Sequence, residues 1–151
     1  MTKMTRTNYF PKNTPQAYID FVDFLVSTYP LRNTSHLIWE FTNRPEVAHK
    51  AWGINYNATY DGQKCTTCNV AMGSLKMPRP IEKVLHTIAH EYRHAMQYDI
   101  GLEGDCTEAD KFADKVAKAY IWLDPTGEVE KAIASAAGTA QTAPEMQGRG
   151  L

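Results

Sequence analysis

The chain has 151 residues, of which 43% are hydrophobic and 22% charged, and its formal net charge is −1. This composition is typical of one globular domain with its own apolar core. The near-neutral balance, without a block of basic residues, argues against nucleic acid or an anionic membrane surface as a partner. No apolar run approaches the length of a bilayer span, and the polar N-terminus lacks the apolar centre of a signal peptide. We therefore expect a cytoplasmic protein, and three cysteines, an odd number, fit a reducing compartment better than a disulfide framework.

The N-terminal region is predicted to be a loose arm, residues 1–13, followed by a helix. Asn13 or Thr14 can cap this helix, and Pro15 suits its first turn. Its apolar residues recur at three- and four-residue spacing, namely Tyr18, Phe21, Val22 and Leu25. Such a stripe should face the core.

Three short strands are predicted next, because apolar and polar residues alternate. The stretch "SHLIWEF" places Leu37, Trp39 and Phe41 on one side of a strand. The stretch "AWGINYNATY" alternates in the same way, and the turn sequence "YDGQ" separates it from a third strand at "CNVAMG".

Two further helices are predicted, at about 80–99 and about 107–123. The first has an apolar stripe made of Ile81, Val84, Leu85, Ile88, Tyr92 and Ala95. A second, polar stripe of the same helix contains His86, His90, His94 and Gln97. After Asp124 the chain becomes rich in Ala, Gly, Thr and Gln, which predicts a flexible tail over 125–151, with a short helix near 129–137. The folded domain should therefore span residues 1–124.

The polar stripe contains the pattern H-E-x-x-H, formed by His90, Glu91 and His94. Residues four apart lie on the same helical face, one turn from each other, so both imidazoles can bind one zinc ion. Glu91 would lie beside the metal without binding it, where it can accept a proton from the water that attacks a carbonyl. His86 is about 12 Å from His94 on a straight helix, too far to share an ion. A supporting role near the site and simple solvation are both open for His86.

A catalytic zinc needs a third protein ligand and an open position. Gln97 and Ile100 stand where the metzincin form of the motif requires glycine and histidine, so that class is excluded. The remaining candidates are the carboxylates Glu103, Asp105, Glu108 and Asp110. Asp105 and Glu108 also fit a capping box, which would give Glu108 a purely structural role. Asp110 is favoured as a partner that orients a ligating histidine.

The two helices resemble those of minimal gluzincins, the small phage- and bacteria-type zinc metallopeptidases that include the ImmA/IrrE-like peptidases. The resemblance lies in "VLHTIAHEYRHAMQ" followed by "EADKFADKVA", and it covers about residues 50–123. It implies an α+β zincin-like domain with a short twisted sheet, an active-site helix and a glutamate-bearing helix. It also implies His90, His94 and Glu108 as the Zn²⁺ ligands, and a phage-encoded protein acting in the host cytoplasm.

Cys65 and Cys68 form the pattern C-x-x-C, which is half of a structural zinc site. Completing such a site would require Cys106 together with His36 or His49. We favour reduced cysteines packed in a hairpin, with a structural zinc and a redox pair as the alternatives.

We therefore predict a zinc metallopeptidase that acts on a peptide or protein, with Glu91 as the general base. The strand at residues 69–72 is expected to lie next to the active-site helix and to bind an extended substrate by strand addition. Two alternatives are a non-catalytic zinc-bound module that binds a protein, and a phage accessory protein that acts through contacts made by residues 125–151.

Overall fold

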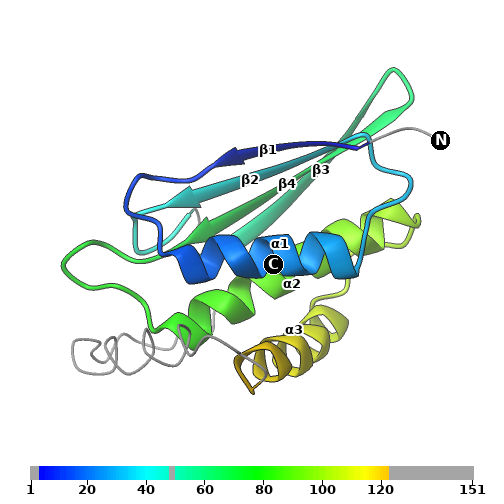
Figure 1. Cartoon of the computed structure of the whole chain (residues 1–151). Helices are drawn as coiled ribbons and strands as arrows, with labels where there is room; N and C mark the ends of the chain where they lie inside the picture. Colours follow the sequence, from blue (N-terminus) through cyan, green and yellow to red (C-terminus); the bar gives the residue numbers. More distant parts are fainter. Residues whose placement is uncertain (1–3, 48–49, 123–151) are drawn as a thin grey trace.

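The computed structural model describes residues 4–47 and 50–122, which form three helices and a four-stranded mixed sheet (Figure 1). The strands are β1 (Thr5–Tyr9), β2 (His36–Thr42), β3 (Gly53–Tyr60) and β4 (Gln63–Ala71). The helices are α1 (Gln16–Thr28), α2 (Ile81–Asp99) and α3 (Cys106–Trp122). The α+β class predicted from the sequence is confirmed. The predicted tail over 125–151, with its short helix, lies outside the described residues.

The sheet has the strand order β1-β2-β4-β3, with β3 antiparallel to β4 and the other pairs parallel. A two-residue turn joins β3 to β4, and its residues Asp61 and Gly62 have φ values of 50° and 77°. Positive φ at both positions is the geometry of a tight hairpin turn whose twist matches the strands. As a result β3 lies at one edge of the sheet and β4 lies inside it.

Two sequence predictions about the sheet are corrected by this order. Residues 69–72 do not offer an edge for strand addition, because β4 pairs with β2 on one side and β3 on the other. The sequence also predicts a loose arm over residues 1–13, whereas Thr5–Tyr9 form β1. This strand is held by backbone pairing with β2 and by the ion pair of Arg6 with Asp23 of α1, and neither contact needs an apolar pattern.

The core lies between the sheet and the two helices α1 and α2, which run along the same face of it (Figure 1). The predicted inward residues of β2, Leu37, Trp39 and Phe41, are buried there. The predicted apolar stripes of α1 and α2 are buried as well. Helix α3 packs on α2 on the side away from the sheet, so α2 is enclosed on two sides.

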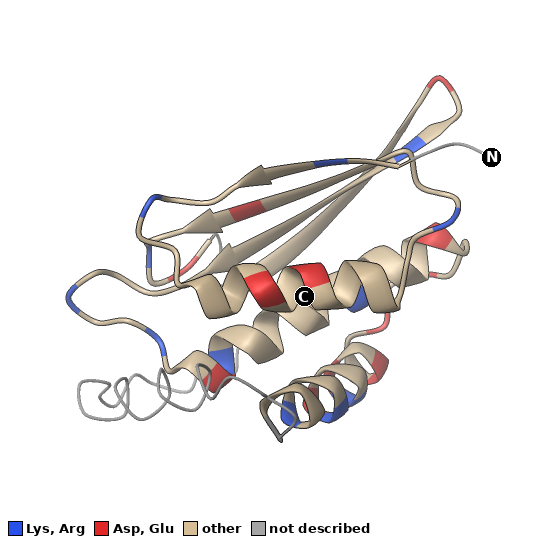
Figure 2. Cartoon of the chain, in the orientation of Figure 1, with Lys and Arg blue, Asp and Glu red and all other residues tan. Residues whose placement is uncertain are grey.

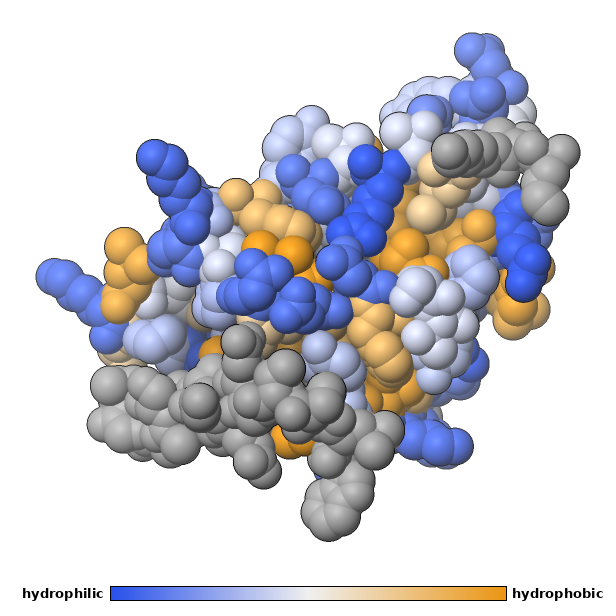
Figure 3. Space-filling model, viewed as in Figure 1, coloured by the Kyte–Doolittle hydropathy of each residue, from blue (hydrophilic) through white to orange (hydrophobic). Residues whose placement is uncertain are grey.

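The surface is mixed in charge and polarity. Acidic and basic residues are interspersed along the helices and loops (Figure 2), and hydrophilic side chains project between smaller apolar patches (Figure 3). No helix in the described part of the chain has both the length and the apolar character needed to cross a membrane.

Candidate metal centre

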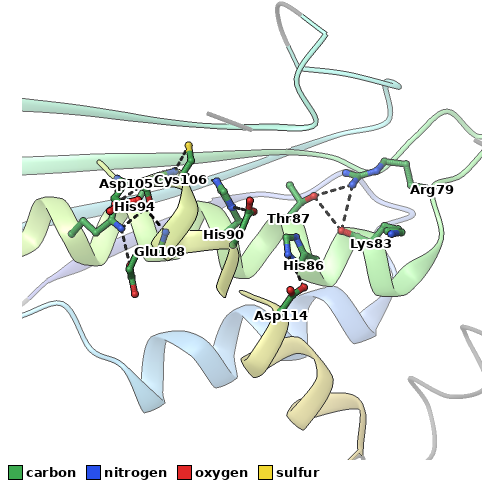
Figure 4. A network of polar contacts seen from close by, with 12 residues as sticks. Arg79, Lys83, His86, Thr87, His90, His94, Asp105, Cys106, Glu108 and Asp114 are labelled. Carbon is green, nitrogen blue, oxygen red and sulfur yellow. Dashed lines mark hydrogen bonds and ion pairs between the residues drawn. The ribbon is translucent and has the colours of Figure 1, made fainter. Parts of the chain in front are cut away.

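Three histidines of α2 face three residues of α3 across the contact between the two helices (Figure 4). Residues four apart share one face of a helix, so two antiparallel helices can pair such residues step by step. The three pairs are His86 with Asp114 at 3.2 Å, His90 with Asp110 at 2.7 Å, and His94 with Cys106 at 3.5 Å. We call this set the histidine ladder. It explains why the sequence repeats histidine at four-residue spacing.

One end of the ladder brings together three side chains that could hold a metal ion. The Nε2 atoms of His90 and His94 are 3.1 Å apart, and His94 Nε2 is 3.5 Å from Cys106 Sγ. All three donor atoms lie within 4.8 Å of one another. A tetrahedral zinc with ordinary bond lengths would separate two nitrogen ligands by about 3.4 Å, and a nitrogen from a sulfur by about 3.6 Å. The two separations from His94 Nε2 are therefore close to those between ligands of one zinc ion.

Both imidazoles turn their Nε2 atoms to this point, because their Nδ1 atoms have other partners. His90 Nδ1 donates to Asp110 Oδ1 at 2.7 Å, and His94 Nδ1 donates to Gln97 Oε1 at 2.8 Å. Burial, together with the neighbouring His94, lowers the pKa of His90 to about 4, so its ring is neutral at physiological pH. The two Nε2 atoms face each other at 3.1 Å, a separation that suits either a hydrogen bond between them or a metal ion bound by both. The structure thus places Asp110 in the orienting position expected from the sequence.

Glu108, the third ligand implied by the family resemblance, is not brought to the two histidines. Arg93 donates to its carboxylate twice, at 2.9 Å from Nε and 2.7 Å from Nη2, and these bonds lower the pKa of Glu108. The physical reason is helical phase: Glu108 lies two positions after Cys106, which turns its side chain about 200° around α3. Cys106 is on the ladder face and takes the place expected for Glu108.

The other predicted carboxylates also have different partners. Asp105 caps α3, because its Oδ1 accepts a hydrogen bond from the Glu108 backbone amide at 3.1 Å. Glu103 lies exposed in the loop between α2 and α3. His86 pairs with Asp114, one turn of the ladder away from His90.

Glu91 is fully buried, and neither oxygen of its carboxylate has a hydrogen-bond partner among the described residues. Burial raises the pKa of Glu91 well above its ordinary value, and the negative charge of Asp110 adds to this. A buried, unpartnered carboxylate is costly and rare in folded proteins, and where it occurs it usually has a functional cause. Glu91 directly follows His90, one of three residues that could hold a metal ion, and a role at that ion would supply such a cause.

The Glu91 side chain depends on a glycine in β3. A Cβ atom at Gly53 would lie 2.6 Å from Glu91 Oε2 and 2.7 Å from Thr87 Cγ2. The sequence places Trp52, Ile54 and Tyr56 on one face of this strand, and Tyr56 is exposed. Gly53 and Asn55 lie on the other face, which faces α2. Only a glycine at position 53 leaves room there for the Glu91 carboxylate.

We expect Gly53→Ala to push the Glu91 carboxylate aside and to lower hydrolysis by roughly 100-fold, the usual cost of a 1 Å misplacement of a catalytic group. Zinc content should stay at the wild-type value, since no metal-binding atom is touched. Peptide-cleavage rates and metal analysis of Gly53→Ala beside the wild type test this, and full activity in Gly53→Ala would contradict it.

A cavity of about 390 Å³ opens beside His94 and Cys106, within the size range of ligand pockets. The other lining residues are Asn55, Asn57, Tyr98, Leu102, Glu103 and Gly104. Its β3 wall is fixed by a closed ring of hydrogen bonds. Asn55 Nδ2 donates to Thr66 Oγ1, Thr66 Oγ1 donates to Asn57 Oδ1, and Asn57 Nδ2 donates to Asn55 Oδ1. A substrate in this cavity would therefore meet a rigid polar wall.

Cys65 and Cys68 do not form a site together. Both lie in β4, three positions apart, so their side chains point to opposite faces of the sheet. Cys68 is buried and donates to the Glu91 backbone oxygen, with Sγ 3.6 Å away. Neither forms a disulfide. This agrees with packed cysteines in a hairpin and excludes a zinc ion or a disulfide shared by the pair; His49 lies outside the described residues.

Sequence reasoning considered Cys106 only as a partner of the C-x-x-C pair. A usable signal was present, because Cys106, Asp110 and Asp114 repeat the four-residue spacing of the histidines in α2. A short connection makes two successive helices antiparallel neighbours, and then the two repeats must face each other.

Comparison of the chain with family models, with curated proteins and with solved structures finds no match. The functional argument therefore depends on the geometry of the site.

Proposed function

We propose that this chain is a zinc-dependent metallopeptidase of zincin-like fold, with His90, His94 and Cys106 as metal ligands and Glu91 as general base. One observation carries the proposal. A fully buried carboxylate, without a hydrogen-bond partner in the described part of the chain, follows directly on one of two imidazoles whose Nε2 atoms converge at 3.1 Å. Packing of a helix in a core does not require this arrangement. Metal-assisted hydrolysis requires both imidazoles and the carboxylate.

The donor set favours zinc. Imidazole nitrogen and thiolate sulfur suit Zn²⁺ better than the hard cations Mg²⁺ and Ca²⁺, which take oxygen ligands. Three protein ligands leave one position open, which is typical of catalytic rather than structural zinc. When bound, zinc supplies polarisation of the scissile carbonyl and activation of a water molecule.

The protein's own groups move and hold the protons. Glu91 is the base that accepts the proton of the attacking water at a carboxylate oxygen and then returns it to the leaving amine. Its raised pKa makes it a stronger base than an exposed glutamate. Asp110 and Gln97 hold the protons of His90 and His94 on Nδ1, which keeps both Nε2 atoms available for the metal.

The edge strand β3 supports a peptide substrate. In an antiparallel pair the backbone groups of alternate residues point toward the partner strand. The backbone carbonyl of Trp52 accepts a hydrogen bond from the Ala71 amide, and Tyr60 is opposite Gln63 at the turn. The backbone groups of the residues between them at odd positions, 53, 55, 57 and 59, therefore point away from β4. An extended peptide can add to this edge, next to the cavity lined by Asn55 and Asn57. We assign to β3 the role that the sequence analysis gave to residues 69–72.

Metal content and peptide cleavage, measured on the same protein, test the proposal. We expect one zinc per chain and cleavage of a peptide library, with cleavage lost at least about 100-fold on chelation and restored by zinc. His90→Ala should lose both, whereas His36→Ala, on the uncovered face of β2, should keep both. Zinc without cleavage would instead indicate a non-catalytic binding module, and a protein without zinc affinity would refute the metal site.

A further inference from the structure

We infer that Gln97 is the positioning residue that joins the two halves of the metal site, holding His94 of α2 and the segment that carries Cys106 of α3 in fixed relation. The inference rests on the proposed metal site. It adds a residue outside the H-E-x-x-H motif that would hold two of the metal ligands in place. Gln97 is 5% exposed and lies three residues after His94.

All the hydrogen-bonding capacity of the Gln97 side chain is used. Its Oε1 accepts from His94 Nδ1 at 2.8 Å and from the Asp105 backbone amide at 3.0 Å. Its Nε2 donates to the Asp105 carbonyl at 3.2 Å and to Glu108 Oε1 at 2.8 Å. An amide has two acceptor and two donor positions, so the side chain is fully satisfied.

The backbone of Asp105 determines which way the Gln97 amide points. A backbone N–H can only donate and a carbonyl can only accept, so Oε1 must face the Asp105 amide and Nε2 must face its carbonyl. His94 Nδ1, which also faces Oε1, must then carry the proton, and its Nε2 is left with a lone pair for the metal. Gln97 thus links the position of Asp105 to the orientation and the tautomer of the His94 ring.

The same contacts fix the chain just before Cys106. Residues 100–105 between α2 and α3 are exposed, and Cys106 is the first residue of α3. The bidentate clamp of Gln97 on Asp105 sets where α3 begins, and hence where the Cys106 thiol lies. Arg93 holds Glu108 in place to accept from Gln97 Nε2, which gives Glu108 a role in this support although it does not reach the histidines.

We expect Gln97→Met, which keeps the chain length but makes no comparable hydrogen bond, to weaken zinc binding by roughly 10–100-fold, the usual cost of losing a partner of a metal-binding histidine. In Co²⁺-loaded protein the thiolate-to-cobalt charge-transfer band should weaken as well, because the position of Cys106 is loosened. Gln16→Met is the matched control, since Gln16 is exposed on α1 and makes one side-chain bond to Asp20.

The outcomes separate this inference from the proposed function. A wild-type protein that binds neither zinc nor cobalt refutes the metal site itself. If the wild type binds both and Gln97→Met keeps the wild-type affinity and the full band, the positioning role is refuted. Should Gln97→Met fail to fold, the exchange Gln97→Glu/Glu108→Gln decides, because it keeps the acceptor toward His94 and the bond between the two side chains but loses the bond donated to the Asp105 carbonyl. We expect it to weaken zinc binding and the cobalt band, since half of the clamp on Asp105 is lost; a folded exchange variant with the wild-type affinity and the full band would overturn the inference.

Discussion

Replacing Glu91 with glutamine is expected to abolish peptide hydrolysis, lowering kcat by roughly 10²–10⁴-fold, while one zinc ion per chain remains bound. The amide keeps the shape of the side chain in the space beside Gly53, but it cannot accept a proton from water. The metal ligands are untouched, because Glu91 is not among the three convergent donors. Cleavage rates and zinc analysis of the same preparation measure the two effects separately.

Glu82→Gln is the matched control for this substitution. Glu82 lies in the first turn of the same helix, and its side chain is exposed. Its replacement changes the net charge equally and should leave cleavage unchanged. The Glu91→Gln protein should also fold at least as well as wild type, since it removes a carboxylate that is buried without a partner. Activity within a few-fold of wild type in Glu91→Gln would show that another group is the base.

The second large effect is on zinc affinity, and it distinguishes Cys106 from Glu108 as the third metal ligand. Cys106→Ala is expected to weaken zinc binding by at least about 100-fold, because it removes one of three protein donors. Glu108→Gln is expected to keep zinc within about tenfold of wild type, because the Glu108 carboxylate is bound to Arg93 and Gln97 and the amide oxygen can still accept from Gln97. Competition titrations with a chelating dye give both affinities.

Cys65→Ala is the control for removal of a thiol, since Cys65 lies on the uncovered face of β4, opposite to the face of Cys68. The reverse result, zinc retained in Cys106→Ala and lost in Glu108→Gln, would mean that Glu108 is the ligand. Helix α3 would then have to turn on its axis when the metal binds, breaking the pairs of His90 with Asp110 and Arg93 with Glu108.

The helices were predictable because their signals are local. The sequence predicts helices over 80–99 and 107–123, and α2 and α3 begin and end within one residue of these bounds. The strands were less predictable. In β1 the side chains are polar and mostly exposed, so no alternation marks it. The first residues of β4 are also polar, so the prediction begins at residue 68 although the strand begins at Gln63.

The site was predictable only within one helix. The relation of His90, Glu91 and His94 follows from helical geometry alone, and the structure keeps it. The third donor and the support of His94 depend on how α3 packs against α2, which a single helix does not determine. Glu108 lies only two positions from Cys106, but two positions turn a side chain about 200° around a helix, so the rotation of α3 about its own axis decides between a carboxylate and a thiol.

On the proposed function, the histidine ladder would also couple ion uptake to the docking of a whole helix. An exposed loop tethers α3, and the buried side chains of its first two turns are the small residues Ala109 and Ala113, which add little apolar area. An ion shared by His90, His94 and Cys106 would act as a cross-link that exists only when α3 is docked. At a free zinc concentration a hundredfold above the dissociation constant, this linkage favours the docked state by about 2.7 kcal/mol. The zinc supply of the surrounding medium would then govern how much of the protein is assembled, as well as how much is loaded.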